Sequence, residues 1–165
     1  MTKERLFARA FSLLGDFTPL KGDCGELCSK RCCKGDDGTG MLLFPGEKTN
    51  LPVREKNGRR LAVCGGQCER EQRPLSCRLF PLFPVPDAHG GLTAAPDARG
   101  GICPLVHHAA DVPFSFRFRA RVAAVGRLLL RDADCRAFLQ AVWDEMEEAA
   151  ALRRSLTITD DQLKS

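Results

Sequence analysis

The sequence predicts a small α+β fold. An irregular cysteine-rich metal-binding module with short strands carries an N-terminal helix and a C-terminal helical hairpin. Three observations predict this class. The chain has 165 residues, the size of one ordinary domain. Residues 15–104 hold eight of the nine cysteines, 14 of the 15 glycines and nine of the ten prolines, a composition that interrupts long helices and wide sheets. The flanking segments repeat apolar residues at helical spacing.

The N-terminal segment 3–14 is predicted to form an amphipathic helix. Its apolar residues recur every three or four positions, at Leu6, Phe7, Ala10, Phe11 and Leu14. Arg9 interrupts this segment, whereas a secretory signal needs an uninterrupted apolar run. No apolar run approaches the roughly 20 residues that span a bilayer. We therefore expect a cytoplasmic protein with no membrane partner, a setting in which clustered cysteines bind metal more often than they form disulfides.

The middle of the chain contains two predicted short strands, at residues 41–47 and 61–64. Between them, Lys56-Asn57-Gly58-Arg59 is typical of a hairpin turn, because Asn-Gly tolerates positive φ angles. Residues 84–101 contain three prolines and two Gly-Gly pairs, so we expect an exposed excursion there.

After Pro104 the pattern becomes helical. Asp111 and Pro113 mark a helix start. The apolar residues that follow fall on one face of the predicted helix: Phe114, Phe118, Val122, Val125 and Leu129. Asp132 or Asp134 is expected to cap a second helix, with an apolar face at Cys135, Phe138, Leu139, Val142 and Met146. We expect a helical hairpin over residues 111–154, packed on a metal-chelating module of residues 1–110, and a frayed tail over 155–165.

Eight cysteines form an ordered constellation and are the predicted metal ligands: Cys24, Cys28, Cys32, Cys33, Cys64, Cys68, Cys77 and Cys103. Thiolates bind zinc and iron tightly, and a tetrahedral centre needs four of them. Eight are enough for two centres, or for one centre with additional sulfurs. The pairs are spaced Cys-x3-Cys, which is neither the commonest zinc spacing nor the ferredoxin run. The sequence therefore leaves Zn²⁺ and an iron–sulfur cluster both open as the cofactor.

The order of these residues resembles a known family. Its elements are Cys24-x3-Cys28-x3-Cys32-Cys33, then Cys64-x3-Cys68, then Arg73-Pro74-x2-Cys77-Arg78-x-Phe80-Pro81, with Cys103-Pro104 beyond. This pattern is similar to the bacterial cysteine-cluster proteins that chelate zinc or iron (the YkgJ-like, or CxxCxxCC, family). The resemblance implies chelation through eight cysteines, and all eight positions are filled here. The related flagellin lysine methylases carry a similar signature linked to an iron–sulfur centre, which implies protein modification as an alternative activity.

Three other groups of residues have ordinary structural explanations. Cys135 lies on the apolar face of the last predicted helix and is expected in the core. His107 and His108 follow the last ligand closely, but we expect them to be polar residues at the start of a helix, because eight cysteines already satisfy the metal. His89 lies in a Gly/Pro-rich loop and is expected to be exposed.

Three charged residues have both a functional and an ordinary reading. Arg73 and Arg78 flank Cys77 closely enough to stabilise thiolate charge, or they form an ordinary solvated pair. Glu47 is the one carboxylate that we consider as a residue of a functional site. Its ordinary roles would be a helix cap or a surface charge.

The charge pattern favours metal over nucleic acid as the partner. Residues 1–103 contain 16 Lys and Arg against 12 Asp and Glu, whereas residues 104–165 contain nine of each. The excess positive charge therefore accompanies the cysteines, and there is no basic tract typical of a nucleic-acid surface. Our leading hypothesis is a metal-chelating protein, more consistent with a non-enzymatic role, and no catalytic residue is identified. The alternatives are an iron–sulfur-dependent protein-modifying enzyme and a zinc-stabilised module that binds a protein partner.

Overall fold

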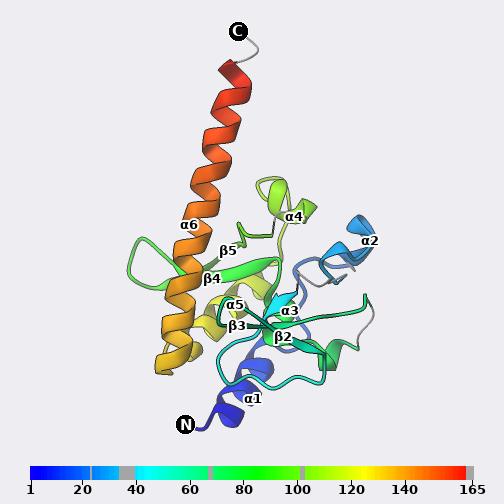
Figure 1. Cartoon of the computed structure of the whole chain (residues 1–165), viewed down its shortest axis with the longest axis vertical. Coiled ribbons are helices and arrows are strands. Elements are labelled where there is room, and N and C mark those ends of the chain that lie inside the picture. The colour runs from blue at the N-terminus through cyan, green and yellow to red at the C-terminus, as the bar shows by residue number, and fades with distance from the viewer. Residues whose placement is uncertain (23, 34–39, 67–68, 101–102, 163–165) are drawn as a thin grey trace.

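A computed structural model describes residues 1–22, 24–33, 40–66, 69–100 and 103–162 of the chain. Within these residues the fold mixes six α-helices with two small antiparallel sheets, which confirms a small α+β protein. Figure 1 shows the C-terminal part of the last helix projecting from a body of helices, strands and loops. In the described part of the chain, no helix combines the length and apolar character needed to cross a membrane.

Helix α1 (Lys3–Leu14) coincides with the predicted N-terminal helix. The Thr2 side chain caps it by accepting a hydrogen bond from the amide of Arg5. Gly15 ends it at a positive φ of 55°, a conformation that favours glycine. The predicted apolar face is buried at Leu6, Phe7, Ala10 and Leu14. The periodicity was therefore sufficient to locate this helix and its buried face.

The first sheet is three-stranded and antiparallel, with the strand order β1-β3-β2. Its strands are β1 (Met41–Leu42), β2 (Val53–Lys56) and β3 (Arg59–Ala62). Asn57 and Gly58 form the predicted turn, with positive φ angles of 52° and 73°. The strand predicted at 41–47 is shorter, because the chain turns at Pro45-Gly46. Strand β2 was not predicted, because all four of its residues are exposed and show no apolar alternation.

The second sheet corrects the prediction of an exposed excursion over residues 84–101. Strands β4 (Leu82–Pro86) and β5 (Leu92–Pro96) pair as an antiparallel hairpin. Both strands are edges of a two-stranded sheet, where proline is tolerated. Leu92 and Ala94 are buried, since helix α5 packs against both strands.

Helix α5 (Phe116–Leu129) begins later than the sequence suggested. Asp111 and Pro113 lie before it, and Ser115 is its cap, with the hydroxyl oxygen accepting from the amide of Phe118 at 3.3 Å. Ser115, and not Asp111, therefore accepts a hydrogen bond from an amide of the first turn of this helix.

Helix α6 (Ala133–Gln162) follows a turn at residues 130–132. Asp132 caps it by accepting from the amide of Cys135 at 3.0 Å, as one of the two predicted caps. The predicted apolar face is buried at Cys135, Leu139, Val142 and Met146 and half-buried at Phe138. The backbone stays helical through Gln162, so the tail expected to fray from Ser155 continues the helix as far as the structure describes it.

Three short helices lie in the cysteine-rich part: α2 (Gly25–Cys28), α3 (Leu75–Leu79) and α4 (Pro104–His107). Two 3-10 turns, η1 (Arg31–Cys33) and η2 (Arg70–Gln72), lie beside them in the chain. No described helix of this part exceeds five residues, as the glycine and proline content predicts.

One hydrophobic core joins the two ends of the chain. It contains residues from α1, α3, β4, β5, α5 and α6. At its centre the Phe44 ring is fully buried, with its centroid 5.0 Å from the Phe138 ring and 6.4 Å from the Phe83 ring. Segments on both sides of residue 110, the predicted module boundary, therefore share this core.

Candidate functional site

A cavity of about 370 Å³ lies between the short helices of the cysteine-rich part and the first sheet. Five of the eight predicted ligands line it: Cys24, Cys32, Cys33, Cys64 and Cys77. Cys24, Cys32 and Cys33 belong to one short segment, and the fold brings Cys64 and Cys77 to them from elsewhere in the chain. In Figure 1 helix α2 lies at the right-hand edge of the molecule, beyond α3 and the first sheet.

The first cysteine cluster is folded into two short helical turns. The amide of Lys30 donates to the Gly25 carbonyl at 2.9 Å and closes the end of α2. Residues 29 and 30 both have positive φ angles, 53° and 56°, and reverse the chain before η1. Residues of both α2 and η1 line the cavity. In η1 the sulfurs of Cys32 and Cys33 lie 4.0 Å apart.

Helix α3 brings Cys77 to the cavity and is anchored in the core. Leu75 and Leu79 are fully buried in the core on one side of this helix. Ser76 donates from its hydroxyl to the carbonyl of Leu42 in β1. With these residues fixed, the same short helix places Cys77 and Arg78 in the cavity wall.

Glu47 is a structural carboxylate that supports α3. It is 1% exposed and does not line the thiol cavity. One carboxylate oxygen accepts from the amide of Leu75 at 2.6 Å, and the other accepts from the amide of Phe44 at 3.0 Å. Burial raises the pKa of Glu47 to about 6, although both hydrogen bonds act in the opposite direction. Glu47 is therefore not a surface charge. It binds the amide of Leu75, the first residue of α3, from a distant segment, whereas Pro74 occupies the N-cap position of that helix.

The remaining predicted ligands lie beside the cavity or outside the described residues. Cys103 precedes α4, is 6% exposed, and packs in a small apolar cluster with Cys24 and Phe80. Burial raises the pKa of the Cys103 thiol, with a smaller contribution from the charge of Cys28. Cys28 ends α2, with its sulfur 4.0 Å from the Cys24 carbonyl. Cys68 lies outside the described residues.

The thiols influence one another's protonation. The pKa of Cys32 is raised first by its hydrogen bond with Cys33 and then by burial. The charges of Cys33, Cys28 and Cys24 raise it further. The Cys32 thiol therefore favours the protonated form until a cation offsets the charge of the neighbouring thiolates. Within the described residues, no three or more Cys, His, Asp and Glu side chains converge closely enough to hold a metal ion.

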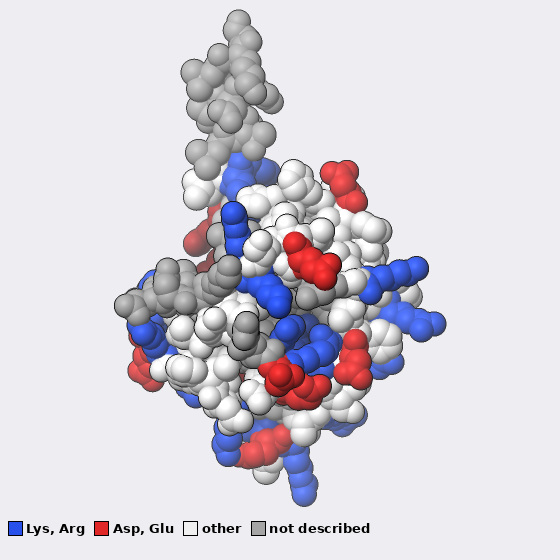
Figure 2. Space-filling view, turned by 90° about the vertical axis from the view of Figure 1, so that its right-hand side faces the viewer, with Lys and Arg blue, Asp and Glu red and all other residues white. Residues whose placement is uncertain are grey.

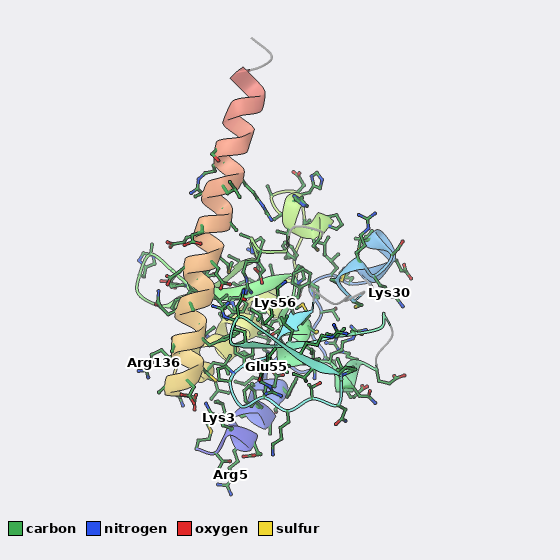
Figure 3. All side chains as sticks on the ribbon, viewed as in Figure 1. Lys3, Arg5, Lys30, Glu55, Lys56 and Arg136 are labelled. Atoms are coloured by element: carbon green, nitrogen blue, oxygen red, sulfur yellow. The ribbon has the colours of Figure 1, made fainter. Side chains whose placement is uncertain are left out.

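Five basic side chains share the cavity with the thiols: Lys21, Lys30, Arg70, Arg73 and Arg78. Figure 2 shows blue side chains gathered in the hollowed centre of this face, with acidic side chains below them. Figure 3 shows Lys30 beside α2. Arg73 and Arg78 line the same cavity as Cys77. Arg70 was missed, because the mixed charges of residues 69–73 are also typical of a solvated turn.

Backbone carbonyls hold two of the guanidinium groups. Arg70 donates to the Phe17 carbonyl at 3.0 Å, and Arg78 donates to the Gly15 carbonyl. The Arg78 guanidinium also lies 5.3 Å from the centroid of the Phe11 ring. These contacts connect the cavity to the end of α1 and the residues that follow it.

The residues that we assigned ordinary roles lie away from the cavity. Cys135 is fully buried in the core, as predicted, and burial raises the pKa of its thiol to about 12. His107 and His108 are exposed, but at the end of α4 and not at its start. His89 is exposed in the turn between β4 and β5, as predicted.

No protein-family model matches this chain, and comparisons with curated proteins and with solved structures give no match either. The family resemblance is therefore a resemblance of motifs alone.

Proposed function

We propose that this chain is a metal-chelating protein whose thiolates coordinate zinc or an iron–sulfur cluster in the cavity. The ligands of this proposal are the eight cysteines Cys24, Cys28, Cys32, Cys33, Cys64, Cys68, Cys77 and Cys103. One observation carries it: five of these cysteines, from separate parts of the chain, line a single cavity. The Cys28 sulfur lies 4.0 Å from the carbonyl oxygen of Cys24, and Cys24 packs against the apolar cluster that contains Cys103. Such an assembly of soft sulfur donors is the chemistry that zinc and iron select.

Electrostatics support metal coordination in this cavity. Protonated thiols must lose their protons to become ligands, and a divalent or cluster-bound metal supplies the positive charge that favours this loss. A centre with four thiolate ligands carries net negative charge when the metal is Zn²⁺. The guanidinium groups of Arg73 and Arg78, which flank Cys77 in the chain and line the cavity, offset part of that charge.

The small amount of packing in this region also favours a bound metal. The apolar cluster next to the cavity contains only three buried residues among those described, Cys103, Leu105 and Val106. Zinc coordination contributes about 10–16 kcal/mol to the folding of zinc-finger peptides at neutral pH. A metal would therefore supply stability that this loop-rich region does not obtain from burial.

The cavity volume favours an iron–sulfur-dependent enzyme as the second candidate. About 370 Å³ lies within the range of roughly 300–1,000 Å³ typical of small-molecule sites. A lone zinc ion draws four sulfurs to about 2.3 Å from the metal, which leaves little space between them. A larger cluster with a substrate beside it would use more of the space. The substrate of such an enzyme would be a protein side chain, if it resembles the flagellin lysine methylases.

Metal analysis of the native protein tests the proposal. The chain is purified anaerobically, its visible spectrum is recorded, and iron, sulfide and zinc are measured per chain. Near-stoichiometric zinc in a colourless protein, or iron and sulfide with visible absorbance, is the expected result, and the two outcomes separate the two cofactors. A metal-free protein that is fully folded, and that binds neither zinc nor reconstituted cluster, would refute the proposal.

A further inference from the structure

We propose that the arginine-lined wall of the cavity is a binding site for an oxyanion, the carboxylate or phosphate group of a small ligand, next to the thiols. The site consists of Arg70, Arg73 and Arg78, which come from η2, the residue after it, and α3. This inference goes beyond metal chelation, because the arginines can recognise an anion whether the nearby thiols are protonated or coordinated.

The arginines are held in place before any ligand arrives. Arg70 and Arg78 each use one terminal nitrogen on a backbone carbonyl, those of Phe17 and Gly15. These neutral acceptors fix the side chains without neutralising them. In the described part of the chain, neither guanidinium forms an ion pair with a carboxylate. The positive charge on this wall therefore remains available to a bound anion.

The Nε atoms of these arginines support the same conclusion. Those of Arg70 and Arg78 are buried and have no hydrogen-bond partner among the described residues. A buried donor without a partner carries a free-energy penalty, which a ligand oxygen would remove. The planar guanidinium offers parallel N–H donors that match the two oxygens of a carboxylate or phosphate.

The charges around the wall favour an anion over a cation or a neutral ligand. Arg70, Arg73 and Arg78 line the cavity together. Among the described residues, the nearby carboxylates that act on Arg78 are those of Asp16 and Glu71, fewer than the three guanidinium groups. Lys21 and Lys30 add positive charge at the cavity wall. An oxyanion would relieve the repulsion between the arginines.

The volume of the cavity also fits a ligand larger than an ion. About 370 Å³ is enough for a small organic molecule with its acidic group on the arginines. Apolar side chains complete the wall, among them Met41, Leu51 and Phe80. The proposed ligand therefore combines one carboxylate or phosphate group with a short apolar part.

Titration of the purified full chain with simple anions tests this site. Isothermal calorimetry is performed with inorganic phosphate and, separately, with acetate, at constant ionic strength against sodium chloride. The metal content of each sample is measured first. We expect saturable binding of at least one of the two oxyanions and none of chloride. The phosphate and acetate arms identify which acidic group the site prefers.

Variants separate this site from general charge effects. Arg70→Gln should weaken the binding of the preferred oxyanion about tenfold or more, because a charged hydrogen bond is lost. Arg70→Lys keeps the positive charge but lacks the parallel N–H donors of a guanidinium. It should therefore give an intermediate loss of oxyanion affinity. Arg5→Gln is the matched control, because Arg5 is exposed on α1 at the lower end of the molecule (Figure 3). It should bind as the native chain does.

The metal content of the variants distinguishes this proposal from metal chelation. Arg70→Gln should keep the metal of the native chain while losing the oxyanion. If it loses both in the same proportion, the arginines serve only to offset thiolate charge, and the anion site is refuted. Absence of saturable binding by phosphate and acetate would also refute it, whatever the metal content. Arg70→Lys, with its expected intermediate loss of oxyanion binding at native metal content, repeats the test if Arg70→Gln fails to fold.

Discussion

The hydrophobic core and the thiol cavity are held together in different ways. In the core, residues such as Phe118 and Leu139 are fully buried on long helices. At the cavity, four of the five cysteines on the wall are only half-buried and lie on short helical turns or helices. The core obtains its stability from the burial of apolar surface, whereas the cavity gathers thiols and like charges that oppose close packing. If the proposed metal is bound, it would therefore contribute more to the stability of the cavity than to that of the core.

The short helix α3 connects these two regions. Leu75 and Leu79 belong to the core, and Cys77 and Arg78 belong to the cavity wall. Glu47, itself buried, holds the first amide of this helix. A change in structure at the cavity can thus reach the core through the five residues of α3. The following predictions separate the two regions, from the largest expected effect to the smallest.

Two cysteine substitutions give the sharpest contrast. Cys77→Ala should lose bound metal and lower the free energy of unfolding by about 3–5 kcal/mol, a part of the roughly 10–16 kcal/mol that zinc coordination contributes in peptides. Cys135→Ala should lower it by about 1–2 kcal/mol, because it only removes a buried sulfur from the core. Metal analysis and denaturant unfolding measure both effects. Equal loss of metal in the two variants would show that the division between ligands and core is wrong.

The contact between α5 and the β4-β5 hairpin provides the second test. A Cβ atom added at Gly126 would lie 2.4 Å from the Cβ of Pro84 and 2.8 Å from a methyl group of Leu92. Gly126→Ala should therefore destabilise the core by about 2–3 kcal/mol through overpacking, without changing the metal content. Gly22→Ala is the control, because its added Cβ meets no described atom within 4 Å. Equal unfolding free energies for the two variants would contradict the packing of the hairpin on α5.

The third prediction concerns the pH dependence that Glu47 imposes on the junction between the regions. Its folded pKa of about 6 is above the ordinary value of 4.5, so the folded state binds the proton more tightly. The resulting stability is fully present below pH 4.5 and is lost as the pH rises through 6. This loss amounts to about 2 kcal/mol, at 1.36 kcal/mol for each pKa unit.

Comparison of the native chain with Glu47→Gln isolates this effect. The difference in unfolding free energy between the two proteins should change by about 2 kcal/mol between pH 4.5 and pH 7. Taking the difference cancels the pH dependence of metal binding, which both proteins share. Denaturant titrations at the two pH values provide the measurement. A difference that is the same at both pH values would show that Glu47 does not titrate in this range.

The sequence predicted the features that depend on local patterns. Helix α1 and the buried face of α6 follow from apolar periodicity, and the turn at Asn57-Gly58 follows from tolerance of positive φ. The β4-β5 hairpin was missed because its prolines and glycines resemble a loop, and its burial depends on α5, which is distant in sequence. Local pattern contains no information about such a contact.

The candidate site shows the same limit. Clustering and cysteine order identified the proposed ligands, but not which of them would share a cavity wall. Cys64 and Cys77 reach the first cluster through β3 and α3, and their approach depends on packing. Arg70 was not predicted for the same reason, because its charged neighbours are typical of an exposed turn and its contact is the distant Phe17 carbonyl.

The smallest expected effect concerns the turn that leads into the cavity wall. Gly58 has a φ of 73°, and no described atom lies within 4 Å of an added Cβ, so Gly58→Ala changes backbone strain alone. It should lower the free energy of unfolding by about 1 kcal/mol. Because β3 leads directly to Cys64, the metal affinity of this variant tests how rigidly the first sheet places that thiol. We expect unchanged metal content, since Cys64 is 9% exposed and is held by its own packing. Loss of metal with a stability change of only about 1 kcal/mol would show instead that the turn, and not the packing around Cys64, positions this part of the wall.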